Sequence, residues 1–172
     1  METMARTLPE CRFTGSRATF DVMHRARVAQ QRHRHSFLFS LHVLVGLREI
    51  PGVAQDILMK AGLVDGFDML THVRKEFEKW AWEEFDEDQD NRRISTPTVL
   101  SAMDHVRYIP KPKNGHGVIE PEHVLYSLLL RDDEVLRILS LAGVNSDSVL
   151  HETQVWIEFM QVLEPIRRNS TD

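Results

Sequence analysis

An internal duplication constrains the fold of this chain more than any other feature of its sequence. An offset of 81 residues places Ser40–Leu47 on Pro121–Leu128, and the alignment runs without a gap from Phe13 to Leu63. Ten aligned pairs are identical: His24/His105, His35/His116, His42/His123, Val43/Val124, Leu44/Leu125, Leu47/Leu128, Ile57/Ile138, Leu58/Leu139, Ala61/Ala142 and Gly62/Gly143. Chance rarely matches so many positions in about fifty, so the sequence predicts two copies of one structural unit.

Both copies carry the periodicity of helices. Apolar residues recur at steps of three and four from Ala18 to Ala29, which indicates one buried helix face. The segment Leu41–Leu47 is apolar on nearly all sides, which is typical of a buried helix. Gly62 and Gly143 each fit the end of a helix, because glycine adopts the left-handed conformation at little cost. We therefore predict an all-α fold in which two pseudo-symmetric four-helix repeats form one compact eight-helix domain.

Polar caps and a proline predict where the helices begin. Ser95-Thr96-Pro97 is typical of a cap followed by proline at the first helical position. Thr14 or Ser16 is expected to cap the first helix, Ser40 the central helix of the first unit, and Ser146 the last helix. The stretch Gln31–His35 is expected to be polar and exposed. The predicted organisation is a flexible leader at 1–12, a domain at 13–163 and a tail at 164–172; within the domain, repeat 1 spans about 13–82, an acidic linker 83–93 and repeat 2 about 94–163.

Composition excludes several broad classes of protein. The net charge of −5 and the pI of about 6.0 do not favour a nucleic-acid partner. No apolar run approaches the roughly 20 residues of a membrane span, and Met1–Glu10 lacks the apolar core of a secretory signal. The single cysteine, Cys11, has no intramolecular partner, which suggests a reducing compartment. We expect a cytoplasmic protein.

These motifs, in this order and spacing, resemble a known family. The residues that carry the resemblance are Phe13-Thr14, His35–Leu38, Ser40–Leu47 and Ile57–Gly62 in the first copy, and Ile94-Ser95, Pro121–Leu128 and Ile138–Gly143 in the second. Each copy resembles a Clp repeat, and the pair resembles the N-terminal domain of the Clp/Hsp100 AAA+ unfoldases. The resemblance covers about residues 13 to 163.

The resemblance implies a domain that binds and does not catalyse. In the unfoldases this domain receives substrates and adaptor proteins ahead of the ATPase ring. This chain has no Gly-x-x-x-x-Gly-Lys-[Ser/Thr] motif, so it has no phosphate-binding loop of that kind. We expect a stand-alone Clp N-domain without ATPase modules, and the start at Met1 and the polar tail favour a natural short protein over an excised piece. A bacterial cytoplasm is the expected location, with an organelle stroma left open.

Departures from the family pattern identify the candidate binding residues. In Gram-positive relatives each central helix begins with Thr-Glu-His, and the glutamate helps to bind phosphoarginine. The first copy here reads Ser40-Leu41-His42 and has lost the acid, whereas the second reads Pro121-Glu122-His123 and keeps it. The resemblance therefore suggests these ligand- or peptide-binding residues: Glu122, Ser95, Thr14 and Ser40.

Each candidate also has a purely structural interpretation. Glu122 stands in the first turn of a helix, where the dipole stabilises a carboxylate by roughly 0.3–1 kcal/mol, but a carboxylate there also suits a guanidinium group. His42 and His123 are expected to be hydrogen-bonded core or capping residues, and His24 and His105 to share one structural contact. The run Arg32-His33-Arg34-His35 is a poor metal site, because zinc needs three or four ligands and the arginines repel a cation.

Trp82 and Phe85 adjoin the acidic linker and form a candidate apolar patch for a partner. The leading hypothesis is a non-catalytic binding module of the Clp system that uses the groove between the repeats. Its partners would be Clp/Hsp100 ATPase or peptidase components, adaptor proteins or substrate peptides, with no cofactor, nucleic acid or membrane. A decoy or sensor for a small molecule or a phosphoarginine-marked peptide is the alternative, and a histidine-dependent metal enzyme is the remote one.

Overall fold

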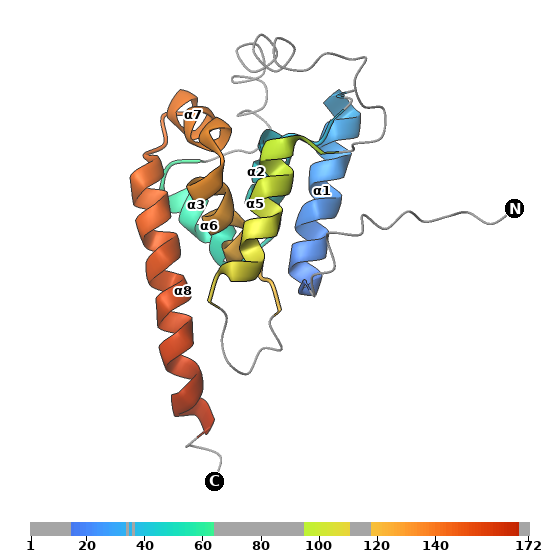
Figure 1. Cartoon of the computed structure of the whole chain (residues 1–172). Helices are drawn as coiled ribbons and strands as arrows, with labels where there is room; N and C mark the ends of the chain where they lie inside the picture. Colours follow the sequence, from blue (N-terminus) through green and yellow to red (C-terminus); the bar gives the residue numbers. More distant parts are fainter. Residues whose placement is uncertain (1–14, 34, 36, 64–94, 111–117, 169–172) are drawn as a thin grey trace, which may run out of the picture.

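The fold is built from helices, as the sequence predicts. The computed structural model describes residues 15–33, 35, 37–63, 95–110 and 118–168, with the side chains of 97 and 163–168 left out. Its helices are α1 Arg17–His33, α2 Ser40–Glu49, α3 Val53–Lys60, α5 Pro97–His105, α6 Pro121–Arg131, α7 Asp133–Leu141 and α8 Ser146–Arg168, with a 3-10 turn, η1, at Val106–Tyr108 (Figure 1). The described residues contain no strand beyond two isolated backbone bridges.

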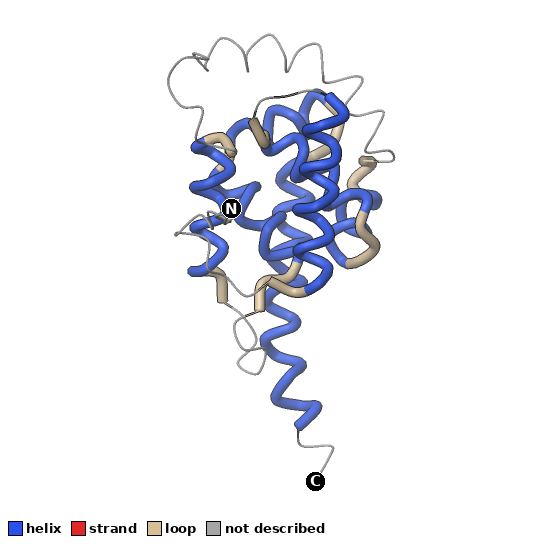
Figure 2. The backbone as a smooth tube through the Cα atoms, turned by 90° about the vertical axis from the view of Figure 1, so that its right-hand side faces the viewer, coloured by secondary structure: helices blue, strands red, loops and turns tan. Residues whose placement is uncertain are grey.

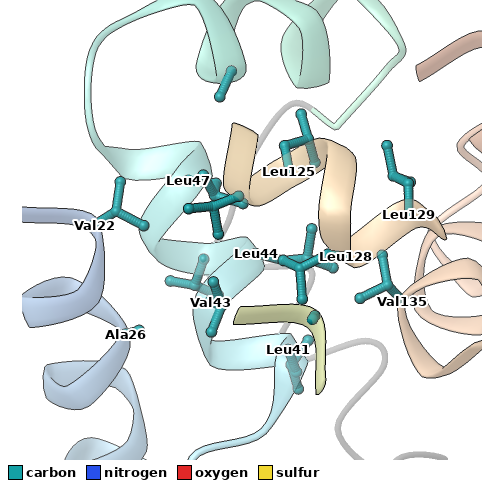
Figure 3. Packing of buried hydrophobic residues seen from close by; sticks show 14 of the residues in the cluster. Val22, Ala26, Leu41, Val43, Leu44, Leu47, Leu125, Leu128, Leu129 and Val135 are labelled. Carbon is teal, nitrogen blue, oxygen red and sulfur yellow. The ribbon is translucent and has the colours of Figure 1, made fainter. Parts of the chain in front are cut away.

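The two central helices, α2 and α6, form the middle of the core. Leucines at two matched positions are fully buried, Leu44 and Leu47 on α2 and Leu125 and Leu128 on α6, and Leu41 of α2 is buried as well. Figure 3 shows these leucines in one cluster with Val22 of α1 and Val135 of α7. The prediction that both central helices are buried is therefore confirmed.

Helix caps agree with the sequence at the starts of α1 and α5 and differ from it at the starts of α2 and α8. Ser16 Oγ accepts the Thr19 N–H at 3.2 Å, and Thr96 Oγ1 accepts the Val99 N–H at 3.5 Å. Gly62 and Gly143 follow α3 and α7 with φ of 103° and 73°, as their predicted role as helix ends requires. The predictions for Ser40 and Ser146 are wrong by one residue, because α2 and α8 begin at these serines themselves. Phe39 is the cap of α2, and Asn145 Oδ1 accepts the Ser148 N–H at 3.1 Å at the start of α8.

The central helices share a histidine cap. The Phe39 N–H donates to Nδ1 of His42 at 2.9 Å, and the Glu120 N–H donates to Nδ1 of His123 at the same distance. Each ring thus satisfies a backbone donor at the start of its own helix. The prediction of capping histidines in both copies is confirmed.

The duplication has a different register in the first helices. The caps Ser16 and Thr96 are 80 residues apart, and so are the buried pairs Thr19/Val99, Val22/Ala102 and Ala26/Val106. From Leu38 and Ile119 onward the offset is 81. The gapless frame therefore misaligned α1 with α5. His24 is exposed, whereas His105 contacts Ser127 Oγ at 3.0 Å, so the prediction of a shared contact for these two histidines is wrong.

Close packing of the first helix on the central helix is common to both units. A Cβ atom on Gly46 would lie 2.3 Å from the Val22 carbonyl oxygen, so α1 approaches α2 as closely as a glycine allows. In the second unit, Ser127 occupies the matching position and its Oγ donates to the Ala102 carbonyl at 2.5 Å. In the second unit, the helices therefore meet through this hydrogen bond in place of the glycine contact.

The units exchange their leading segments. The Ser16 N–H donates to the Ile119 carbonyl at 2.9 Å, just before α6, and the Thr96 N–H donates to the Leu38 carbonyl at 3.2 Å, just before α2. Each first helix therefore starts beside the central helix of the other unit. This exchange ties the two repeats into one body.

The last helix is longer than the sequence suggested. α8 continues to Arg168, through the region predicted as a tail from 164, and its final turns project beyond the rest of the bundle (Figures 1 and 2). Three predicted segments lie outside the described residues: the leader at 1–12, the fourth helix of the first repeat and the acidic linker 83–93. The predicted count of eight helices therefore stays a prediction.

Candidate functional site

An open groove of about 590 Å³ lies between α3 of the first unit and α8 of the second. Its lining is apolar at Val53, Ile57, Val155, Trp156 and Phe159, and polar at Asp56, Lys60, His151 and Glu152. The groove is thus between the two repeats, where the sequence analysis expects the binding surface. The apolar lining suits a hydrophobic side chain of a ligand, with charged groups at the edge.

The groove follows from the way α8 packs on the body. Val149, Thr153 and Ile157, at steps of four residues, turn inward and are buried. That orientation leaves Val155 and Phe159 outward, 50% and 48% exposed. The Phe159 ring stands 5.9 Å from the Trp156 ring, so the two aromatics form one continuous wall.

Trp156 connects the groove to Glu122. Burial raises the pKa of the Glu122 carboxyl; its own backbone N–H opposes the rise, Glu120 adds to it, and the Trp156 indole N–H opposes it. The buried indole Nε1 is close enough to this carboxyl to act on its pKa, but it makes no hydrogen bond of normal geometry to it or to any other described residue. A half-buried carboxylate beside an unsatisfied N–H is a site where a ligand with both donors and acceptors would relieve a cost.

The other candidate residue of the central helices, Ser40, does not join Glu122 at this edge. Ser40 is fully buried, and its Oγ–H donates to Oδ2 of Asp132, the cap of α7. Burial raises the pKa of Asp132, and the bond from Ser40 opposes this rise. Ser40 is therefore placed to hold the two repeats together in the core.

Ser95 belongs to the α2 edge of the molecule. It is buried and bridges Leu38, two residues before Ser40, whereas the segment before α6 bridges Gly15. The exchange of leading segments thus places Ser95 beside α2, which has Leu41 where α6 has Glu122. Thr14, Trp82 and Phe85 lie outside the described residues.

The histidine-rich stretch is partly buried, which corrects the sequence prediction. His35 is buried because its Nδ1 pairs with Nε2 of His42 at 2.8 Å. Since Nδ1 of His42 accepts the Phe39 N–H, the His42 proton lies on Nε2 and points to His35. Burial, with help from His35 and His33, lowers the pKa of His42 to about 3.

The described residues contain no group of three or more histidine, cysteine, aspartate or glutamate side chains placed to hold a metal ion. His35 and His42 instead bond to each other. Within the same ranges, no helix has both the length and the apolar character needed to cross a membrane.

Comparison with solved structures identifies the architecture. The N-terminal domain of the caseinolytic protease associated chaperone ClpD from Arabidopsis thaliana superposes with a TM-score of 0.52 at 12% sequence identity, covering 84% of this chain and 94% of that domain. The chain has the fold of a Clp N-terminal domain. No model of a known family matches the sequence, and no curated protein matches it either.

Sequence reasoning missed most of the groove residues. Val155, Phe159 and Val162 recur at steps of four and three, which indicates a second apolar face on the last helix. That pattern could have revealed the groove residues, but the inward face through Val149 and Thr153 was sufficient to predict the helix, so the second face was not considered. Asp56 and Lys60 carried no signal, because single charges on a short helix are common.

Proposed function

We propose that this chain is a non-catalytic protein-binding module of the Clp chaperone–protease system. The observation that carries the proposal is the open apolar groove between α3 and α8 on a Clp N-terminal fold. The groove offers hydrophobic surface with charges at its edge, which is the composition of a recognition site. Its ligand would be a segment of a substrate, an adaptor protein or another Clp component.

A pull-down tests the proposal. The purified chain is immobilised and exposed to the Clp/Hsp100 ATPase, the peptidase and the adaptors of its own source. That source is expected to be a bacterial cytoplasm or an organelle stroma. We expect at least one of them to be retained. Val155→Glu, in the groove, should abolish retention, whereas Leu141→Glu, on α7 and similarly exposed at 43%, should not.

Two outcomes would contradict either the groove as the binding surface or the proposed role in the Clp system. Retention that survives Val155→Glu would place the binding surface elsewhere on the fold. If none of the Clp components, adaptors or substrates is retained by the wild-type chain, the proposal as a whole fails.

A second function is favoured by the environment of Glu122. Its half-buried carboxylate, with a pKa raised mainly by burial, would be stabilised by a guanidinium group, because an opposite charge offsets the cost of burial. A decoy or sensor for phosphoarginine-marked peptides would use such a group. Titration of phosphoarginine against the wild type and Glu122→Gln should show binding only to the wild type; equal or negligible binding to both would eliminate this function.

A further inference from the structure

The apolar surface of the groove continues along α8 beyond the body of the protein. Val155, Phe159 and Val162 lie at i, i+4 and i+7, and they are 50%, 48% and 64% exposed. This spacing places the three side chains on one face of the helix, away from the buried Thr153 and Ile157. α8 therefore has one apolar face in the core and a second that is open to a partner.

The walls of the groove favour a helical partner. Both walls are helices, whose backbone N–H and C=O groups are bonded within their own turns, so the groove offers no strand edge. An extended segment on these apolar walls would leave backbone groups without partners, whereas a helix satisfies its own. From His151 to Val162, α8 rises about 16 Å, which is matched by about three turns of a partner helix.

The charges at the rim favour a basic partner. The groove lining carries two carboxylates, on Asp56 and Glu152, against one lysine, Lys60. The exposed Glu158 adjoins Phe159 on α8 and adds a third carboxylate beside this surface. A second copy of this chain would bring the same carboxylates together, and like charges at an interface are unfavourable. Lysine or arginine residues beside an apolar stripe would complement the rim.

We propose that the groove and the exposed face of α8 bind an amphipathic helix of about three turns whose apolar stripe is flanked by lysine or arginine. The inference rests on the proposed function and names the chemistry of its partner. Phe159 is at the centre of the exposed face and packs on Trp156, so it is the expected anchor.

A synthetic peptide tests this partner directly. The probe is a fluorescent peptide of about 14 residues with leucines at i, i+4, i+7 and i+11 and with lysines and alanines elsewhere, titrated against the full chain by anisotropy. One control has the same composition with the leucines scattered around the helix, and the other has glutamates in place of the lysines. We expect the basic amphipathic peptide to bind at least about tenfold more tightly than either control.

Matched variants locate the binding site. Phe159→Ala should weaken binding of the basic amphipathic peptide about tenfold, as expected for loss of an interface anchor. Phe20→Ala should leave binding unchanged, since Phe20 is 59% exposed on α1, across the bundle from α8 (Figure 1). Circular dichroism of both variants checks that the fold is retained.

Several results would overturn the inference. Equal binding of the scattered peptide, equal loss in Phe20→Ala, or an extended bound peptide in transferred NOE spectra would each exclude an amphipathic helix at this site. A dimer of the free chain that is lost in Phe159→Ala would assign the surface to a second copy. Retention of a Clp component without peptide binding would overturn only this inference, whereas peptide binding without such retention would contradict only the proposed function.

Discussion

The starts of α2 and α6 have the same backbone frame and different chemistry. In the first turn of each, a histidine accepts the backbone N–H of the cap residue at 2.9 Å. Between cap and histidine, however, α2 has Ser40 and the fully buried Leu41, whereas α6 has Pro121 and the half-buried Glu122. The duplication thus preserved the element that forms the helix and let the neighbouring residues diverge.

That divergence gives the two helix starts different surroundings. At α2, Ser40 donates to Asp132 in the interior and Leu41 packs in the core, so this end serves stability. At α6, the carboxylate of Glu122 is near the aromatic wall of the α3/α8 groove. One repeat start joins the halves, and the other is available to a ligand.

The largest expected effect breaks what the two starts share. Leu44→Asp and Leu125→Asp should each destabilise the domain by about 3–5 kcal/mol or unfold it, because both leucines are fully buried and an unpaired charge there is costly. Thermal melting followed by circular dichroism measures this. Leu130→Asp, on α6 but 44% exposed, is the control and should melt near the wild type. Cooperative melting of Leu44→Asp at the wild-type temperature would contradict the buried central helix.

A pH titration sharpens the comparison at the histidine caps. The pKa of His42 is lowered to about 3, so the unfolded chain binds more protons than the folded chain between about pH 6.5 and 3. The contribution of the buried, neutral His42 to the free energy of unfolding is present above pH 6.5 and is lost on acidification. The loss is about 2 kcal/mol between pH 7 and pH 5.

Urea unfolding at pH 7 and pH 5 measures this loss. His42→Asn should remove most of the dependence of stability on pH in this window. The exposed His24→Asn is the control and should keep it. An unchanged pH dependence in His42→Asn would show that His42 is not the titrating group.

The last expected effect concerns the serine that only α2 has. Ser40→Ala removes the donor to Asp132 and should cost about 1–3 kcal/mol at pH 7. Because burial already raises the pKa of Asp132 and Ser40 opposes that rise, the cost should be larger at pH 7, where the carboxyl ionises, than at pH 4. Pro121→Ala, at the matching position of α6, should change the free energy of unfolding much less. An equal cost of Ser40→Ala at both pH values would contradict this role for Asp132.

Sequence patterns predicted local features well. The apolar runs of α2 and α6, the glycines after α3 and α7, and the capping role of His42 and His123 all depend on residues close in the chain, and the structure confirms them. The register of α1 against α5 was predicted one residue out, because an identity between His24 and His105 outweighed the burial pattern. Only packing against Gly46 and Ser127 fixes that register.

The candidate site was predicted only in outline. Glu122 and the groove between the repeats were expected, but Phe159, Asp56 and Lys60 were not, since α3 and α8 are about a hundred residues apart in the chain. Ser95 was grouped with Glu122 in sequence, whereas the exchange of leading segments places it beside Leu38. Which residues of the two repeats lie side by side depends on tertiary packing, and local patterns in the sequence do not reveal it.

The sequence by itself determined the all-α class, the duplication, the buried central helices and their histidine caps, because helical period, glycine conformation and short-range hydrogen bonds are local physics. Tertiary structure alone decided which unit starts beside which central helix, that Ser40 binds Asp132, and that the second apolar face of α8 remains open beside α3. Those outcomes follow from the packing of two helical units into one core, where the burial of one face determines which other faces are exposed.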